Sequence, residues 1–132
     1  MSLRERITAL EESENVDTVA DVSALSEGAQ TDFFGSHPNG VNIPLGNPED
    51  ASNGVGTDSL TVIDFSSRPQ RTEQGFRGND RSVEITRDEQ LVHELGDHAY
   101  KTDNGTLEGT HNARERAARK FTRRYASKKK RQ

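Results

Sequence analysis

Residues 91–100 read Leu-Val-His-Glu-Leu-Gly-Asp-His-Ala-Tyr, and this stretch organises the rest of the chain. Apolar residues recur every four positions within it, which is the spacing of one face of an α-helix. Upstream, Thr86 and Glu89 have the spacing of a capping box, and Asp103-Asn104-Gly105 supplies a stop signal downstream. The pattern therefore predicts a helix that starts at Thr86 and carries both histidines near its middle.

His93, Glu94 and His98 resemble the metallopeptidase pattern His-Glu-x-x-His, but with one residue too many. In that pattern the histidines lie four residues apart, so both imidazoles reach one zinc ion and the glutamate polarises the metal-bound water. On a regular α-helix, residues five apart diverge by about 140°, against about 40° for residues four apart. A regular helix therefore cannot bring His93 and His98 to one metal.

Three arrangements would restore a metal site. The preferred one is a π-bulge, which absorbs one residue, makes His93 and His98 neighbours and leaves Glu94 as the general base. In the second, Asp97 replaces the second histidine as an oxygen ligand. In the third, Glu94 and His98 are the ligands, and the general base is lost. Against all three stands the interpretation of these residues as solvated side chains on an exposed helix face.

Further segments surround the motif, namely Gly54-Val55-Gly56-Thr57-Asp58-Ser59, the strand Leu60 to Phe65, Asn104-Gly105, and Thr110-His111-Asn112 followed by Arg116. Together with residues 91–100, they resemble the effector-type zinc metallopeptidases delivered by type III secretion, over roughly residues 39–125. The resemblance implies a zincin-like fold, a zinc cofactor held by His93 and His98, and Glu94 as the base. It also implies that zinc-bound water attacks the carbonyl of a protein or peptide substrate. The extra residue, most simply Asp97, also allows a degenerate descendant that has lost the metal.

A third metal ligand has to come from elsewhere in the chain. Glu108 and Glu115 are the nearest downstream carboxylates, and Glu115 joins the candidate metal set of His93, His98 and Asp97. Each glutamate has a competing role: Glu108 would keep a loop soluble, and Glu115 would be the third residue of the last helix. His37 and His111 are interpreted as surface residues.

Shorter patterns predict the other elements. Before the motif they are a helix capped by Ser2 and ending near Asn15, a second short helix or docking segment over 16–25, and a loop over 28–57 with one short edge strand at Val41 and Ile43. An antiparallel pair of strands is expected at Leu60–Phe65 and Val83–Ile85. A last helix is expected after Asn112, with Ala117, Phe121 and Tyr125 as its apolar stripe and Glu115 paired with Arg119.

These elements predict a small α+β, zincin-like domain with a short antiparallel sheet, a motif-bearing helix, a C-terminal basic helix and long irregular loops. The expected division is an N-terminal helical segment over 1–27, the α+β domain over 28–126 and a basic disordered tail over 127–132. The last segment is too rich in like charges to be expected to hold a structure without a partner.

Composition limits the classes of function. Only 29% of the residues are hydrophobic and the mean hydropathy is −0.96, so the core is expected to be small. The absence of cysteine excludes a disulfide scaffold, a thiolate zinc finger and a cysteine nucleophile. With no apolar leader and no long apolar run, we expect a soluble chain with no membrane span and no classical signal peptide. The sequence does not distinguish among a cytoplasmic location, a virion-associated location and export by a non-classical route.

The charge is divided unevenly along the chain. Residues 1–112 hold 21 Asp and Glu against 8 Lys and Arg, whereas residues 113–132 hold 10 Lys and Arg and a single acidic residue, Glu115. This basic end could bind nucleic acid or an acidic partner, and its candidate contacts are Arg123, Arg124, Lys128, Lys129, Lys130 and Arg131. The second hypothesis is therefore a non-catalytic structural or assembly protein, such as a viral or phage particle component, with other protein subunits as its partners.

Overall fold

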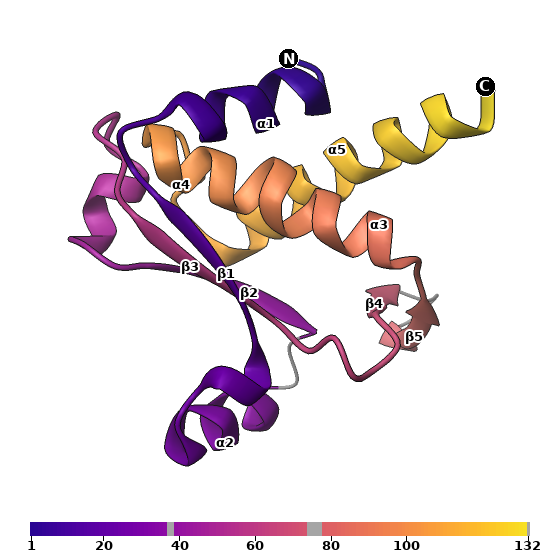
Figure 1. Ribbon diagram of the computed structural model, residues 1–132. Helices are drawn as coiled ribbons and strands as arrows, with labels where there is room; N and C mark the ends of the chain where they lie inside the picture. Colours follow the sequence, from indigo (N-terminus) through magenta and orange to yellow (C-terminus); the bar gives the residue numbers. More distant parts are fainter. Residues whose placement is uncertain (37–38, 74–77, 132) are drawn as a thin grey trace.

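The computed structural model describes residues 1–36, 39–73 and 78–131, with the side chains of 72, 73 and 127–131 left out (Figure 1). The fold is mixed α+β. In chain order its elements are α1 (Leu3–Glu12), β1 (Asp17–Asp21), the 3-10 turn η1 (Val22–Ala24), α2 (Glu27–Gly35), β2 (Gly40–Pro44), the 3-10 turn η2 (Pro48–Ala51), β3 (Ser59–Ile63), β4 (Gln70–Glu73), β5 (Arg81–Glu84), α3 (Arg87–Leu91), the π-helix η4 (Val92–Ala99), α4 (Tyr100–Asn104) and α5 (His111–Arg131).

A three-stranded sheet supports the motif helix, in the order β1-β3-β2. β3 is its centre, parallel to β1 and antiparallel to β2. The expected strand at Val83 exists as β5, but the prediction that it pairs with β3 is wrong. Both edges of β3 are already occupied, so β5 pairs with β4 in a separate two-stranded sheet.

The segment over 16–25 is not the short helix that its valine spacing suggested. It forms β1 and then η1, and the backbone of Asp17–Asp21 pairs with Ser59–Ile63. Val16 and Val19 are exposed, so the three-residue rhythm does not mark a buried helix face. The strand results from pairing with a segment about 40 residues away, and local periodicity carries no record of such pairing.

The region over 28–57 is more ordered than the predicted loop. The strand expected at Val41 and Ile43 is confirmed as β2, but α2 and η2 were missed. The Ser26 hydroxyl accepts a hydrogen bond from the N–H of Ala29, which caps α2. Phe33 then packs into the small apolar core with Val22 and Val62, whereas its neighbour Phe34 is exposed.

Helices cover the two faces of the sheet unequally. α2 and η1 lie on one face, while α1, the α3-η4-α4 helix and α5 lie on the other (Figure 1). The face below η4 is polar at its centre. There the amide of Asn42 donates to the hydroxyls of Ser59 and Thr61, both hydroxyls donate to Asp17, and Thr102 of α4 donates to Asn42. These bonds tie the sheet to the motif helix.

The motif helix begins and ends where the sequence predicted. The Thr86 hydroxyl accepts from the N–H of Glu89, and Gly105 ends the helix in the left-handed conformation at a φ of 79°. Gly56, at a φ of 81°, passes so close that a Cβ there would lie 1.8 Å from the carbonyl oxygen of Asp103. Only glycine fits this contact, which fixes the end of α4 against the loop before β3.

α5 begins at His111 rather than after Asn112, because the Thr110 hydroxyl caps it by accepting from the N–H of Ala113. Of the predicted stripe, Ala117, Phe121 and Tyr125 are only partly buried, whereas Ala118 is fully buried. The helix then runs to Arg131 and leads away from the rest of the fold, through residues that were expected to be unstructured (Figure 1).

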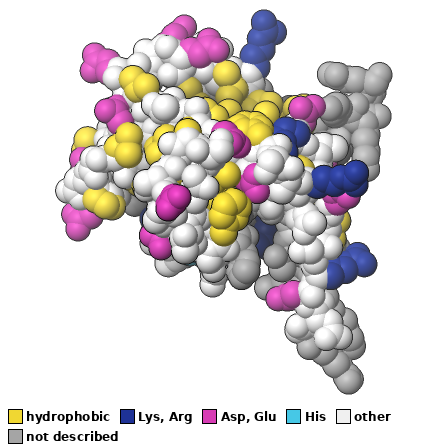
Figure 2. All heavy atoms as spheres, turned by 60° about the horizontal axis from the view of Figure 1, so that its bottom comes forward, with side chains coloured by type: hydrophobic (Ala, Val, Ile, Leu, Met, Phe, Trp, Pro, Cys, Tyr) yellow, Lys and Arg dark blue, Asp and Glu magenta, His cyan; other side chains and the backbone are white. Residues whose placement is uncertain are grey.

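Charged and apolar groups are mixed on the surface. On the face shown in Figure 2, acidic side chains surround several exposed apolar ones, and basic side chains gather toward one margin. None of the helices formed by the described residues has both the length and the apolar content needed to cross a bilayer.

Candidate metal centre

The motif lies on a π-helix. From Val92 to Ala99 the backbone is wider than an α-helix, and the N–H of Tyr100 donates to the carbonyl of Leu95, five residues earlier. This bonding pattern makes residues five apart neighbours on one face. The preferred arrangement of the three drawn from the sequence is therefore the one that the backbone adopts.

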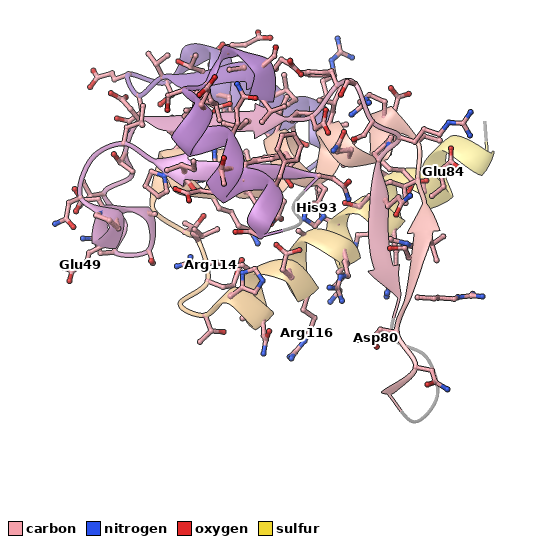
Figure 3. The ribbon with its side chains drawn as sticks, turned by 90° about the horizontal axis from the view of Figure 1, so that it is seen from below. Glu49, Asp80, Glu84, His93, Arg114 and Arg116 are labelled. Atoms are coloured by element: carbon pink, nitrogen blue, oxygen red, sulfur yellow. The ribbon has the colours of Figure 1, made fainter. Side chains whose placement is uncertain are left out.

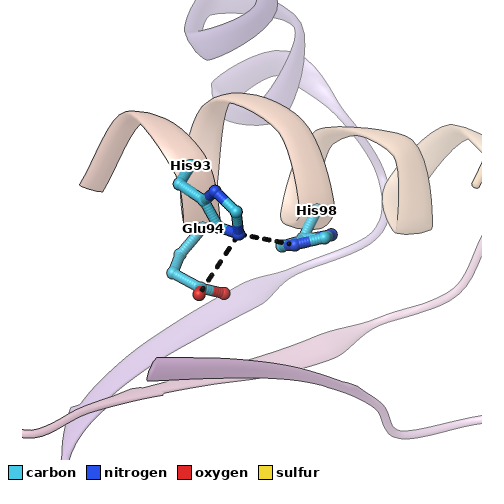
Figure 4. Close-up of side chains that lie close together, drawn as sticks. All are labelled: His93, Glu94 and His98. Atoms are coloured by element: carbon cyan, nitrogen blue, oxygen red, sulfur yellow. Dashed lines mark hydrogen bonds and ion pairs between the residues drawn. The ribbon is translucent and has the colours of Figure 1, made fainter. Parts of the chain in front are cut away.

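The wide turn brings the two histidines together. The Nε2 atoms of His93 and His98 lie 3.0 Å apart, and their rings meet edge to face with centroids 4.7 Å apart (Figure 4). Both rings point from η4 toward the sheet (Figure 4). At least one Nε2 must carry a hydrogen for the two to form a hydrogen bond.

Glu115 closes the group from a different helix. One carboxylate oxygen lies 3.1 Å from Nε2 of His98, and the other lies 3.2 Å from Nε2 of His93. The residue sits in the second turn of α5, where this helix packs on η4. The expected pairing of Glu115 with Arg119 is thus replaced by contacts with the two imidazoles. Of the two downstream glutamates, the structure brings this one to the histidines.

Glu94 lies beside the pair and is almost fully buried, at 6% exposure. One carboxylate oxygen is 4.0 Å from Nε2 of His93, and the other, Oε2, has no hydrogen-bond partner among the described residues (Figure 4). Gly40 of β2 makes the space for this side chain, because a Cβ there would lie 3.2 Å from Cγ of Glu94.

Burial and pairing shift the proton affinities of the group. Burial raises the pKa of Glu94. Burial alone would lower the pKa of His98, but the hydrogen bond to Glu115 and the charge of Glu94 outweigh it, so the pKa is raised. Burial likewise opposes the charge of Glu115, yet hydrogen bonds from both histidines hold its pKa well below the usual range. Glu115 is therefore ionised, and Glu94 holds a proton more readily than an ordinary glutamate does.

Asp97, the alternative second ligand, lies apart from this group. Its carboxylate is buried, 3.1 Å from Nη1 of Arg6 and 3.2 Å from Nζ of Lys101. Lys101 also pairs with Glu108, so the other downstream glutamate is engaged away from the histidines. The structure thus holds Asp97 between two cations, apart from the histidines. Glu94, by contrast, has a carboxylate oxygen within 4.8 Å of a ring nitrogen of each histidine, so His93, Glu94 and His98 form a group that could hold a metal ion.

A groove of about 850 Å³ opens at the centre. The histidines, Glu94 and Glu115 line it together with β2, α2 and residues of α5, including Arg114 and Arg119. In the view from below, His93 lies near the middle of the molecule and Arg114 stands nearby on α5, while Arg116 points outward (Figure 3). The groove gives the site access to solvent and room for a ligand.

Several residues around the centre were not predicted. Arg6 and Gly40 carry no local sequence signal for this role, since they reach the centre only through the packing of α1 and β2. Arg114 and Arg119 were read as part of a basic end, and they line the groove. His111 is exposed as expected, and His37 lies outside the described residues.

The candidate contacts of the basic end lie away from this group. Arg123 and Arg124 are exposed on α5. The side chains of Lys128, Lys129, Lys130 and Arg131 lie outside the described ones.

Comparison of the chain with models of protein families, with curated proteins and with solved structures finds no match.

Proposed function

We propose that this chain is a zinc-dependent metallopeptidase whose metal is held by His93, His98 and Glu115. The observation that carries the proposal is the convergence of two Nε2 atoms and a carboxylate, from two helices, within 3.0 to 3.2 Å of one another. A motif with five-residue spacing has no reason to converge in this way on an ordinary helix. Here the backbone departs from the α-helix at the motif itself.

The donor set fits zinc. Two histidines and a glutamate form one of the ligand sets of catalytic zinc sites, which leave a fourth position for water or substrate. Ligand atoms about 2.0 to 2.1 Å from a tetrahedral ion lie about 3.3 Å from one another. The observed separations are slightly shorter, so the side chains need only small movements to admit the ion. A zinc ion bound there would supply a Lewis acid that lowers the pKa of water.

The other residues fit hydrolysis. Glu94 follows the first ligand directly and lines the groove, and one of its carboxylate oxygens is buried without a hydrogen-bond partner among the described residues. Burial raises its pKa toward the range in which a carboxylate accepts a proton from water and later returns it to the leaving amine. Gly40 opposite leaves the carboxylate free to do so, because no side chain stands between β2 and Glu94.

The groove favours an extended peptide as the substrate. Among the described residues, β2 lies at the edge of the sheet and pairs on one side only, and Gly40, Val41, Asn42 and Ile43 line the groove. An extended peptide can add to such an edge through main-chain hydrogen bonds. This would hold the chain across the mouth of the site, with a carbonyl near the two histidines.

Metal binding is the first test. The purified chain is stripped with a chelator and titrated with zinc by calorimetry, and we expect about one zinc ion per chain. His98→Ala should abolish this binding, whereas His111→Ala, which removes an exposed groove histidine, should leave it intact. Wild-type protein that binds no zinc would contradict the proposal.

Hydrolysis is the second test. The zinc-loaded chain is incubated with an unfolded protein such as reduced casein, and fragments are followed by mass spectrometry. We expect cleavage that stops on chelation and returns with zinc. Zinc binding without cleavage would identify a degenerate site that keeps its metal.

The basic end supports a second candidate function, which is binding of an acidic partner such as nucleic acid. It rests on α5, which leads away from the body and exposes Arg123 and Arg124 (Figure 1). Replacing both arginines with glutamine should weaken binding to a DNA duplex and reduce its salt dependence. Binding that is equal for both proteins would exclude these residues.

A further inference from the structure

The structure also indicates what keeps the motif helix wide. A π-helix is less stable than an α-helix of the same length, so a run of eight π-helical residues needs support from its surroundings. The motif itself supplies none, because its histidines meet only after the turn has widened. The support must lie on another side of η4.

Arg6 of α1 reaches that other side. Its Nη1 donates to the carbonyl oxygen of Gly96 at 3.0 Å and to the carboxylate of Asp97 at 3.1 Å. Lys101 contacts the same carboxylate from one turn later, at 3.2 Å. The guanidinium thus holds a main-chain and a side-chain oxygen of two successive residues inside the widened turn.

The Arg6 side chain is itself fixed in place. Its guanidinium carbon lies 3.9 Å from the ring centroid of Phe121 on α5 and 4.9 Å from that of Tyr100 on α4. Gly96 lets α1 and α5 approach, since a Cβ there would lie 2.7 Å from Leu3 and 3.1 Å from Phe121. Arg6 therefore lies where α1, α5 and the continuous α3-η4-α4 helix meet.

The contact is poorly suited to a role in stability alone. Asp97 is only 1% exposed, and both Nε of Arg6 and Oδ2 of Asp97 are buried without a hydrogen-bond partner among the described residues. Buried ion pairs often contribute little net stability, because desolvation offsets their attraction, and their best attested role is to fix a register. An α-helical turn at this place would rotate Asp97 away from Arg6 and leave the largely buried guanidinium without its carboxylate partner, whereas Lys101, four residues after Asp97, would still reach that carboxylate.

We infer that Arg6, acting through Asp97 and the carbonyl of Gly96, is a positioning residue that holds η4 in the π-helical register and so sets the distance between His93 and His98. Asp97 is the extra residue of the motif, and in this role it anchors the insertion instead of binding metal. The consequence for zinc rests on the proposed function, whereas the consequence for the backbone does not.

The test compares Arg6→Met with Arg4→Met, which removes an exposed arginine from the same helix. In the metal-free protein, the N–H of Tyr100 donates to the carbonyls of both Leu95 and Asp97, and amide hydrogen exchange at Tyr100 reports how firmly this end of the π-helix is held. We expect Arg6→Met to speed this exchange by about tenfold and Arg4→Met to leave it unchanged. In zinc titrations, Arg6→Met should lower the affinity by about 10- to 100-fold, the usual range for partners that orient a ligand, and Arg4→Met should leave it unchanged.

The effect of Arg6→Met is then measured in a protein from which Asp97 has been deleted, and this comparison separates control of the register from general packing. The deletion shortens the motif to four-residue spacing, which an ordinary α-helix satisfies, so the histidines should converge without Arg6. In the deletion protein we expect Arg6→Met to leave zinc affinity unchanged. An equal loss in both backgrounds would overturn the inference, because it would show that Arg6 supports packing in general.

Equal exchange and equal zinc affinity in Arg6→Met and Arg4→Met would also overturn the inference. If the wild-type chain binds no zinc, the proposed function fails, yet the exchange measurement still decides whether Arg6 holds the register. If Arg6→Met does not fold, Asp97→Asn replaces it, since this variant keeps the shape and removes the charge. The same faster exchange at Tyr100 is then expected, and unchanged exchange overturns the inference.

Discussion

Two sides of η4 place carboxylates in different electrostatic settings. On the side that faces α1, Asp97 lies between Arg6 and Lys101, so its charge is neutralised by fixed cations. On the side that faces the groove, the carboxylate of Glu115 rests on His93 and His98. Imidazoles can lose their protons and become metal ligands, whereas a guanidinium cannot. The carboxylate of Asp97 is therefore held by permanent cations, whereas that of Glu115 is held by imidazoles that could instead bind the proposed zinc ion together with it.

The largest effect expected on the groove side concerns Glu94. Replacing it with glutamine keeps the size of the side chain but removes the proton acceptor, so peptide hydrolysis should fall by about 10²- to 10⁴-fold. Zinc affinity should stay close to that of the wild type, because Glu94 is not one of the three ligands. Cleavage rates and calorimetric titrations of the two proteins check this. Unchanged hydrolysis would remove Glu94 from the reaction.

The two carboxylates can be compared directly by matched replacements. Glu115→Gln removes a proposed ligand and should lower zinc affinity by about 100-fold, whereas Asp97→Asn acts only on the register and should lower it by about tenfold. Both variants exchange a carboxylate for an amide of the same shape. A larger loss for Asp97→Asn would reverse the roles that the structure gives to the two sides.

Gly96 tests how closely the α1 side is packed. Gly96→Ala places a Cβ 2.7 Å from Cδ1 of Leu3, so we expect the free energy of unfolding to fall by about 1–3 kcal/mol. Gly28→Ala is the matched control, because that helical glycine has no neighbouring atom within 4 Å. It should raise the free energy of unfolding by about 0.4–1 kcal/mol. Urea denaturation measures both changes in the free energy of unfolding. Equal changes would show that α1 can shift to accommodate the added Cβ at little cost.

The smallest effect is a pH dependence of the metal-free protein. The pKa of His98 is raised above its ordinary 6.5, so its contribution to stability is full below pH 6.5 and is lost as the pH rises through the folded-state value. The pKa of Glu115 is lowered from 4.5, so its contribution is full above pH 4.5 and is lost on acidification. The pair should therefore stabilise the fold most between pH 4.5 and 6.5.

Glu115→Gln should lower the free energy of unfolding by about 1 kcal/mol in that window and by less on either side. Glu49→Gln, which alters an exposed glutamate on η2, is the control and should show no such maximum. Chemical denaturation in the presence of chelator, repeated across the pH range, gives both curves. A difference that does not vary with pH would show that Glu115 acts through packing.

Local patterns determined much of this fold. Ser2, and Thr86 with Glu89, predicted the starts of two helices, Gly105 predicted the end of one, and the β-branched run from Leu60 predicted a strand. Each of these signals acts over a few residues, so it can be read without knowledge of distant contacts. The α+β class follows from them and is confirmed.

The sequence of the motif did not determine which of the three arrangements of its residues is formed. It supplied His93, Glu94 and His98, and the five-residue spacing showed that a regular α-helix would separate the histidines. Which of three arrangements holds depends on partners far away in the chain. Glu108 and Glu115 were the nearest downstream carboxylates, and Glu115 was the one placed in the candidate metal set; the packing of α5 on η4 brings this residue to the imidazoles.

Only the tertiary structure decided the register of the motif and the pairing of the strands. Arg6 and Asp97 are 91 residues apart in the chain, and β1 joins β3 across about 40 residues. Periodicity and capping report short-range preferences, whereas these contacts exist only when remote segments pack together. For that reason the sequence determined which groups this protein carries, and the packing of α1, α5 and the sheet around η4 decided which of them meet.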